Sequence, residues 1–194
     1  MVRSVFVGIA ILFSVGLVGC GLSPQNLTPE PRFTGQLVAV GQGQPVQVRV
    51  MDARTSPIIG TRGGVYAQSN AITVNAQSFL PRLQAETEAA VRLLGFTPVA
   101  QRNSGAQLNL QLIELRYKAA EDNAFIKEAQ LQAVYALDVQ NGARRYNGRY
   151  AATLNQGYAK APNEKTNTAL VSQVLSEGLQ RVFNDPAIGQ LLAQ

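Results

Sequence analysis

The chain has 194 residues, of which 46% are hydrophobic and 15% charged, so its length and composition fit one globular domain with a hydrophobic core. It contains no histidine, no tryptophan and a single cysteine. Histidine is the usual base that activates a hydroxyl or thiol nucleophile at neutral pH, so Ser-His-Asp triads, Cys-His pairs and His/Cys zinc sites are excluded. One cysteine allows no internal disulfide, and we expect packing to hold the fold without a cofactor.

Residues 1–19 have the features of a bacterial lipoprotein signal peptide. Arg3 gives the positive start, and residues 5–18 are an uninterrupted run of apolar and small side chains. As a helix this run would be about 21 Å long, shorter than the roughly 30 Å hydrocarbon core of a bilayer. The pattern therefore favours a cleaved signal over a permanent transmembrane helix. The alternatives are an ordinary signal peptide that contains a cysteine, or a short buried helix.

The signal ends in Leu17-Val18-Gly19-Cys20, which resembles the bacterial lipobox. We expect the thiol of Cys20 to take a diacylglyceryl group, whose acyl chains (palmitate in the typical case) would hold the protein on a bilayer almost irreversibly. Gly21 follows where a lipoprotein retained in the inner membrane usually carries Asp. By resemblance to that sorting rule, the expected location is the outer membrane, facing the periplasm.

Residues 20–31 contain three prolines and no apolar periodicity. This composition predicts a flexible tether, partly stiffened by proline, between the lipidated cysteine and the domain. A single globular domain is expected over residues 32–194.

The first half of that domain predicts a strand, an irregular excursion and a helix. Alternating valines over residues 46–50 indicate a half-buried strand that ends near Asp52. Glycine, arginine and hydroxyl residues predict an excursion over residues 52–70, followed by a short extended piece at residues 72–74. An amphipathic helix follows, with Ser78 expected as its N-cap and Gly95 as its C-terminal stop.

The second half predicts three antiparallel strands. Alternation over residues 107–117 changes phase between Leu112 and Ile113, which indicates a β-bulge. A polar turn at residues 121–123 leads to a strand over residues 129–139. Asn141-Gly142 then predicts a hairpin with a type I′ turn, because both residues tolerate positive φ.

A second long helix is expected after Asn163, and a short final helix after Asp185-Pro186. The predicted order is β-α-β-β-β-α, without an internal repeat. We therefore expect an α+β fold of two layers, an antiparallel β-meander with two long helices packed on one face. The opposite sheet face would be polar and exposed, or a binding surface.

In the order and spacing of its pieces the chain resembles the YajG-type lipoproteins of Gram-negative bacteria. The resemblance covers nearly the whole chain, and it rests on the lipobox, the strand running into Asp52-Ala53-Arg54, the helix ending Leu94-Gly95-Phe96, the strand over residues 108–117, the tyrosine-rich hairpin and the helix ending Asn184-Asp185-Pro186. It implies an outer-membrane lipoprotein of a family without an established activity. It supplies no catalytic residues.

Few side chains suggest a site. The carboxylates form no convergent pair in the sequence, and Asp52 with Arg54 is more simply explained as a pair that holds the excursion. Cleavage would remove only Arg3, leaving 16 basic against 12 acidic side chains, and the expected compartment lacks nucleic acid. This mild positive balance favours anionic headgroups or peptidoglycan carboxylates as partners, and no nucleic acid.

The hairpin carries the best candidate interaction surface, made of Arg144, Arg145, Tyr146, Arg149 and Tyr150. Arginine and tyrosine are both common at protein interfaces. Two plainer explanations stay open, since charged edges prevent strand-to-strand aggregation and cross-strand tyrosines stabilise any sheet.

These observations predict a non-enzymatic binding or accessory module of the cell envelope. Its partners would be the bilayer, through acylated Cys20, and an envelope protein. The alternative is a protein that binds a lipid or peptidoglycan fragment in an apolar cavity between helices and sheet. A hydrolase that uses carboxylates alone is a third candidate, and it needs two carboxylates that converge in a cleft.

Overall fold

The computed structural model describes residues 23–63, 67–100, 105–119, 127–159 and 161–194, with only the backbone at Ala67, Gln68 and Lys127. The predicted signal, Cys20 and the predicted polar turn lie outside these residues. The described elements are β1 (Gln25–Asn26), β2 (Pro45–Asp52), β3 (Ile58–Thr61), the 3-10 helix η1 (Ala67–Asn70), β4 (Ala71–Thr73), α1 (Ala76–Leu93), β5 (Thr97–Val99), β6 (Ala106–Lys118), β7 (Lys127–Asn141), β8 (Arg144–Tyr158), α2 (Glu164–Phe183) and α3 (Pro186–Leu192).

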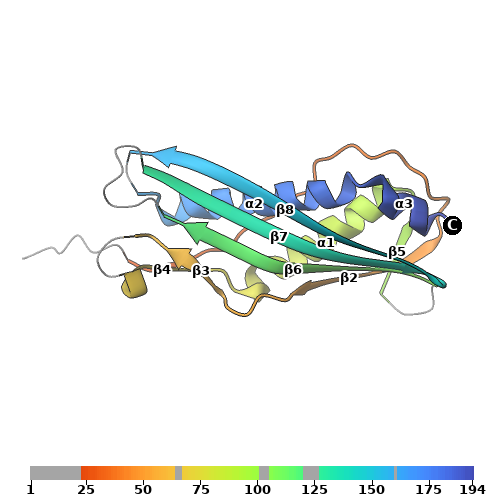
Figure 1. Cartoon of the computed structure of the whole chain (residues 1–194), viewed down its shortest axis with the longest axis horizontal. Coiled ribbons are helices and arrows are strands. Elements are labelled where there is room, and N and C mark those ends of the chain that lie inside the picture. Colours follow the sequence, from red (N-terminus) through yellow and green to blue (C-terminus); the bar gives the residue numbers. More distant parts are fainter. Residues whose placement is uncertain (1–22, 64–66, 101–104, 120–126, 160) are drawn as a thin grey trace, which may run out of the picture.

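Long strands form the centre of one curved sheet, with helices behind it (Figure 1). β6, β7 and β8 pair in succession as an antiparallel meander, as predicted. The register of β6 against β7 shifts between Leu112 and Glu114, which confirms the predicted bulge. The hairpin is confirmed but its turn is not type I′. Asn141 still pairs with Arg144, and only Gly142 has positive φ, as in a type II′ turn that needs glycine at its first central position.

The other edge of β6 meets two short arms. The strand predicted over residues 46–50 (β2) and the extended piece predicted at residues 72–74 (β4) are confirmed, but β1, β3, β5 and the way these arms pair were not predicted. β2 runs parallel to the first half of β6 and carries β5 beside it. The second arm pairs with the other half of β6, where Gly60 of β3 pairs with Tyr117. β4 pairs with β3, and β1 pairs with β4. A Cβ at Gly60 would stand 2.0 Å from the carbonyl oxygen of Tyr117, so only glycine lets β3 approach β6 this closely.

The helices cover one face of the sheet, which agrees with a two-layer α+β domain (Figure 1). Asn163 caps α2 by accepting a hydrogen bond from the backbone N–H of Thr166, as predicted. The prediction for α1 was wrong by one turn, because the helix begins at Ala76 and Ser78 lies inside it. The Ser78 hydroxyl donates to the carbonyl of Asn75 instead. Asp185 caps α3 through the N–H of Ala187.

The core lies between the sheet and the helix layer. Alternate residues of β6 and β7 and the inner stripes of α1 and α2 are almost completely buried. Tyr135 is the largest of them, and its hydroxyl donates to the carbonyl of Leu175 at 3.1 Å. A Cβ at Gly178 would stand 2.5 Å from the Tyr135 ring, so the ring fills the space at this point of α2. No helix in the described part of the chain is long and apolar enough to cross a membrane.

The first described residues are docked on the domain, and the prediction of a flexible tether through residue 31 was wrong for them. β1 adds a strand to β4, and Leu27 is only 2% exposed. Backbone N–H groups of Glu30 and Arg32 then donate to the hydroxyls of Ser172 and Ser176 in α2, each at 2.9 Å. We call residues 23–34 the N-terminal strap. Backbone N–H groups of this strap donate to α1, α2 and β4, which proline content alone could not indicate.

Candidate functional site

The face of the sheet that the helices leave uncovered is the candidate site. We call it the open face and define it by the outward side chains of β2, β6, β7 and β8. The strand registers align these side chains in rows: Gln107–Gln140–Arg145, Arg49–Asn109–Asp138–Asn147, Met51–Gln111–Ala136–Arg149, Glu114–Val134–Ala151, Arg116–Gln132–Thr153 and Lys118–Gln130–Asn155. Amide side chains are the most frequent type in these rows. Each offers donors and an acceptor, so the face can hydrogen-bond to many polar partners.

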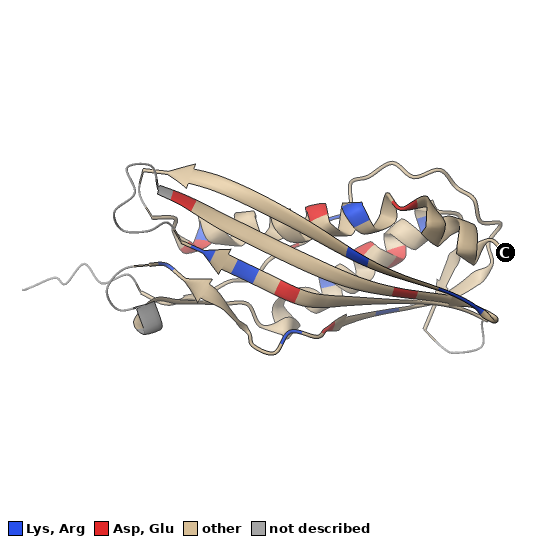
Figure 2. Cartoon of the chain, viewed as in Figure 1, with Lys and Arg blue, Asp and Glu red and all other residues tan. Residues whose placement is uncertain are grey.

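Charges are spaced along this face rather than clustered, as Figure 2 shows in the same view. Two arginines are neutralised locally: Arg145 donates to Asp138 at 2.6 Å, and Arg116 lies 3.1 Å from Glu114. Among the described residues, no carboxylate forms an ion pair with Arg49 or Arg149. Both are exposed, and they lie in adjacent rows on opposite sides of the meander. The two outer strands of the open face therefore each carry an arginine that has no ion pair among the described residues, and Asn109 and Gln111 lie between them.

A shallow hollow of about 270 Å³ lies near the far end of the same face. It is lined by Arg116, Lys118, Gln130, Gln132 and Thr153, so every lining side chain can hydrogen-bond and two are cationic. Such a lining suits an anionic, hydroxyl-rich group and does not suit a lipid tail.

The structure does not bring the five predicted hairpin residues together. Arg145 and Arg149 point to the open face, while Tyr146 and Tyr150 point to the helix side of β8. Arg144 is exposed at the hairpin end. Cys20, the predicted lipidation site, lies outside the described residues.

The two tyrosines hold α3 in place. Both hydroxyls donate to the same carboxylate oxygen of Asp185, Tyr146 at 2.5 Å and Tyr150 at 2.7 Å. Burial alone would raise the pKa of Asp185, but these two hydrogen bonds, together with the one from the backbone N–H of Ala187, outweigh it and lower the pKa below its usual value. Burial, the hydroxyl of Tyr146 at 3.4 Å and the hydrogen bond to Asp185 raise the pKa of Tyr150 above its usual value. Both groups therefore support the structure and are not offered to a partner.

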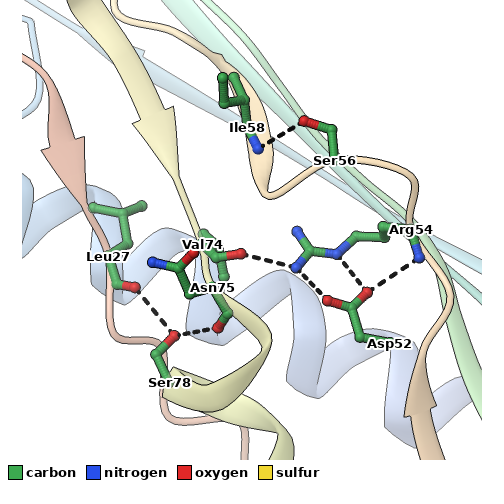
Figure 3. A network of polar contacts seen from close by, with 8 residues as sticks. All are labelled: Leu27, Asp52, Arg54, Ser56, Ile58, Val74, Asn75 and Ser78. Carbon is green, nitrogen blue, oxygen red and sulfur yellow. Dashed lines mark hydrogen bonds and ion pairs between the residues drawn. The ribbon is translucent and has the colours of Figure 1, made fainter.

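Asp52 and Arg54 are also structural, as expected. Figure 3 shows the hydrogen bonds of the Arg54 guanidinium. It donates to both carboxylate oxygens of Asp52, at 2.8 and 2.7 Å, and to the carbonyl of Val74 at 2.9 Å. The Arg54 side chain is only 4% exposed and lies over the ring of Phe79. The pair thus joins the end of β2 to the end of β4, where the two short arms meet.

The described carboxylates do not build a metal centre. No group of three or more His, Cys, Asp or Glu side chains that could hold a metal ion occurs in the described ranges. Glu86, a carboxylate of α1, accepts a hydrogen bond from the backbone N–H of Phe33 and forms an ion pair with Arg82. That carboxylate fixes the N-terminal strap.

Sequence reasoning missed Arg49, Gln111, Arg116 and Gln132 as parts of one surface. Alternation along each strand showed which side chains point outward. It could not show that β2 runs parallel beside β6, which is what places Arg49 in the same row as Asn109 and Asp138.

Comparisons with known proteins identify a family but no activity. The search of curated proteins finds no match. Among solved structures, the chain is similar to a minor lipoprotein from Acinetobacter baumannii, with 9% identity over 77% of this chain and 90% of that one and a TM-score of 0.41. It is also similar to a protein from Xanthomonas campestris, with 14% identity over 87% and 95% of the two chains and a TM-score of 0.42. Likeness at this level carries no functional argument.

The family model for uncharacterised lipoproteins matches residues 31–193, which is nearly all of the globular part. This match agrees with the lipobox-like sequence that ends at Cys20. The chain belongs to this family of uncharacterised lipoproteins.

Proposed function

We propose that the protein is a lipoprotein acylated at Cys20, held in the outer membrane and facing the periplasm, where it acts as a non-enzymatic binding or accessory module. The lipobox-like sequence, Gly21 after the cysteine, and the family match support this assignment. The resemblance to YajG-type lipoproteins supports the same location.

The open face is the proposed contact surface for an envelope protein. The observation that carries this proposal is the pair Arg49 and Arg149. Both are exposed in adjacent rows of the open face, and neither forms an ion pair with another described residue. Packing does not require charged residues there. A partner with carboxylates at matching spacing would compensate both charges and accept hydrogen bonds from the amides.

The test is partner recovery by gentle crosslinking in intact cells, followed by mass spectrometry. Arg49→Glu with Arg149→Glu should abolish recovery of the specific partner, because two attractive charges become repulsive. The matched control is Lys165→Glu with Arg181→Glu on the exposed side of α2, which changes net charge equally. Equal recovery from both double variants would refute the open face as the contact surface.

A second candidate is binding of a small anionic ligand, such as a peptidoglycan fragment with free carboxylates. The polar hollow around Arg116 and Lys118 favours it. The site would lie on the open face and not between helices and sheet, where the Tyr135 ring fills the space against Gly178. Lys118→Ala with Gln132→Ala should weaken binding of a muropeptide in calorimetry, while the control pair on α2 should not.

A further inference from the structure

The N-terminal strap is fixed to the domain from its first described residue. A guanidinium nitrogen of Arg62 donates to the carbonyl of Ser23 at 3.1 Å, and the other terminal nitrogen donates to the carbonyl of Pro162 at 3.2 Å. The side-chain amides of Gln25 and Asn167 are hydrogen-bonded at 2.7 Å, and both are buried. Ser23 therefore has a defined place, beside the start of α2.

That place is at the end of the molecule opposite the hairpin (Figure 1). Gln25 pairs with Ile72, Ile72 with Gly60, and Gly60 with Tyr117, so these residues are level across the sheet. Tyr117 in turn pairs with Leu131, ten residues before Asn141 at the hairpin. At about 3.3 Å per residue, Gln25 lies roughly 33 Å from the hairpin end. Ser23 lies further still, because β1 runs toward the hairpin.

The covalent distance from Cys20 to Ser23 is much shorter than this. Three fully extended residues span at most about 11 Å. Acyl chains on Cys20 would therefore keep the Ser23 end close to the lipid headgroups. An orientation with the hairpin end at the bilayer and the Ser23 end pointing away would need a link of at least about 33 Å between Cys20 and Ser23. The link itself spans only about one third of that distance.

We propose that the Ser23 end of the domain faces the bilayer and that the hairpin end is held away from it. The bilayer-facing end is made by β1, β3, β4 and the start of α2. The open face then runs outward from the membrane, and its hollow at Arg116 and Lys118 lies nearer the membrane than Arg145 does. The domain, and not a flexible tether, sets how far the protein reaches. This inference rests on the proposed acylation of Cys20.

The orientation can be measured by energy transfer from a label on the protein to labelled lipid. Cys20 is the only cysteine, and acylation blocks its thiol, so an introduced cysteine is the only reactive one. Lys165→Cys marks the Ser23 end and Ala143→Cys the hairpin end, and both positions are exposed. The lipidated full-length mature protein is reconstituted in vesicles of phosphatidylethanolamine and phosphatidylglycerol with a small share of headgroup-labelled acceptor.

We expect several-fold more transfer from position 165 than from position 143. A flexible Gly/Ser insertion of about 20 residues after Gly21 has a root-mean-square span of about 25 Å. It should reduce energy transfer from position 165 and make the transfer efficiencies of positions 165 and 143 similar. Equal transfer from both positions in the uninserted protein, or more from 143, overturns the orientation. If the protein does not float with the vesicles and its N-terminus carries no acyl mass, the proposed acylation has failed, and the orientation falls with it.

Discussion

The two faces of the central sheet use the same strands under different constraints. Along β7, Leu131, Ala133, Tyr135 and Leu137 point into the helix layer and are buried, while their neighbours Gln130, Gln132, Asp138 and Gln140 lie on the open face. The covered face contributes most of the packing that stabilises the fold. Apart from Val134, which is 3% exposed, the side chains in the rows of the open face are partly or fully exposed. We therefore expect substitutions of its amides, and of the arginines that form no ion pair in the described part of the chain, to cost little stability, so these residues can be selected for binding.

The largest expected change in the free energy of unfolding distinguishes the covered face from the open face within β7. Tyr135→Ala removes a fully buried ring and its hydrogen bond to Leu175, so we expect it to cost about 3–5 kcal/mol of unfolding free energy. Gln132→Ala, three residues earlier on the open face, should change stability by less than about 0.5 kcal/mol. Urea unfolding of the mature chain carrying Cys20→Ser measures both. Similar losses from the two variants would show that the open face is not free of packing constraints.

A smaller effect should come from the joint between the short arms of the sheet. Arg54→Met leaves the Asp52 carboxylate mostly buried and without its partner, which we expect to cost about 3 kcal/mol. Replacing both residues, as Arg54→Met with Asp52→Leu, should recover much of that loss, because no unpaired charge remains. The same urea titration tests this. If Arg54→Met alone is as stable as the wild type, the ion pair does not hold the two arms together.

Local patterns in the sequence predicted the elements that carry their own periodicity. β6, β7, β8, α1 and α2 repeat apolar residues at the spacing of a strand or a helix, so each could be placed from its own residues. Even the bulge near Ile113 was visible as a change of phase. The short strands β1, β3 and β5 have two to four residues, too few to establish a period, and they form only because longer strands offer them an edge.

The candidate site was predicted only in part, for a related reason. Arg145 and Arg149 were found because they lie in one periodic strand, but Tyr146 and Tyr150 were assigned to the same surface although alternation places them on the other face. Asp185, which both tyrosines contact, is 35 residues or more along the chain. The parallel pairing that brings Arg49 to the open face, and the hydrogen bonds that dock the N-terminal strap, likewise depend on contacts between distant residues.

The smallest expected change in stability concerns β8, the edge strand of the sheet. On its covered side, two tyrosines donate hydrogen bonds to Asp185 at the start of α3. Tyr150→Phe removes one of two hydroxyl donors to Asp185, and we expect it to cost about 1 kcal/mol at pH 7. The remaining bond from Tyr146 and the unchanged ring keep the loss small. Arg149→Ala, one residue earlier but on the open face, should have almost no effect.

This loss should depend on pH with a definite sign. The hydrogen bonds lower the folded-state pKa of Asp185 below its ordinary 3.8, so their contribution is fully present above that value and is lost as pH falls through the lower folded pKa. The difference between the wild type and Tyr150→Phe should therefore stay constant from pH 7 to about pH 5 and shrink below pH 3.8. Asp185→Asn is the matched control, because asparagine still caps α3 but carries no charge to titrate. In that background the effect of Tyr150→Phe should not change over this range. A difference that grows toward low pH would mean that the tyrosines stabilise the protonated carboxyl, and that the charge of Asp185 does not hold α3 against β8.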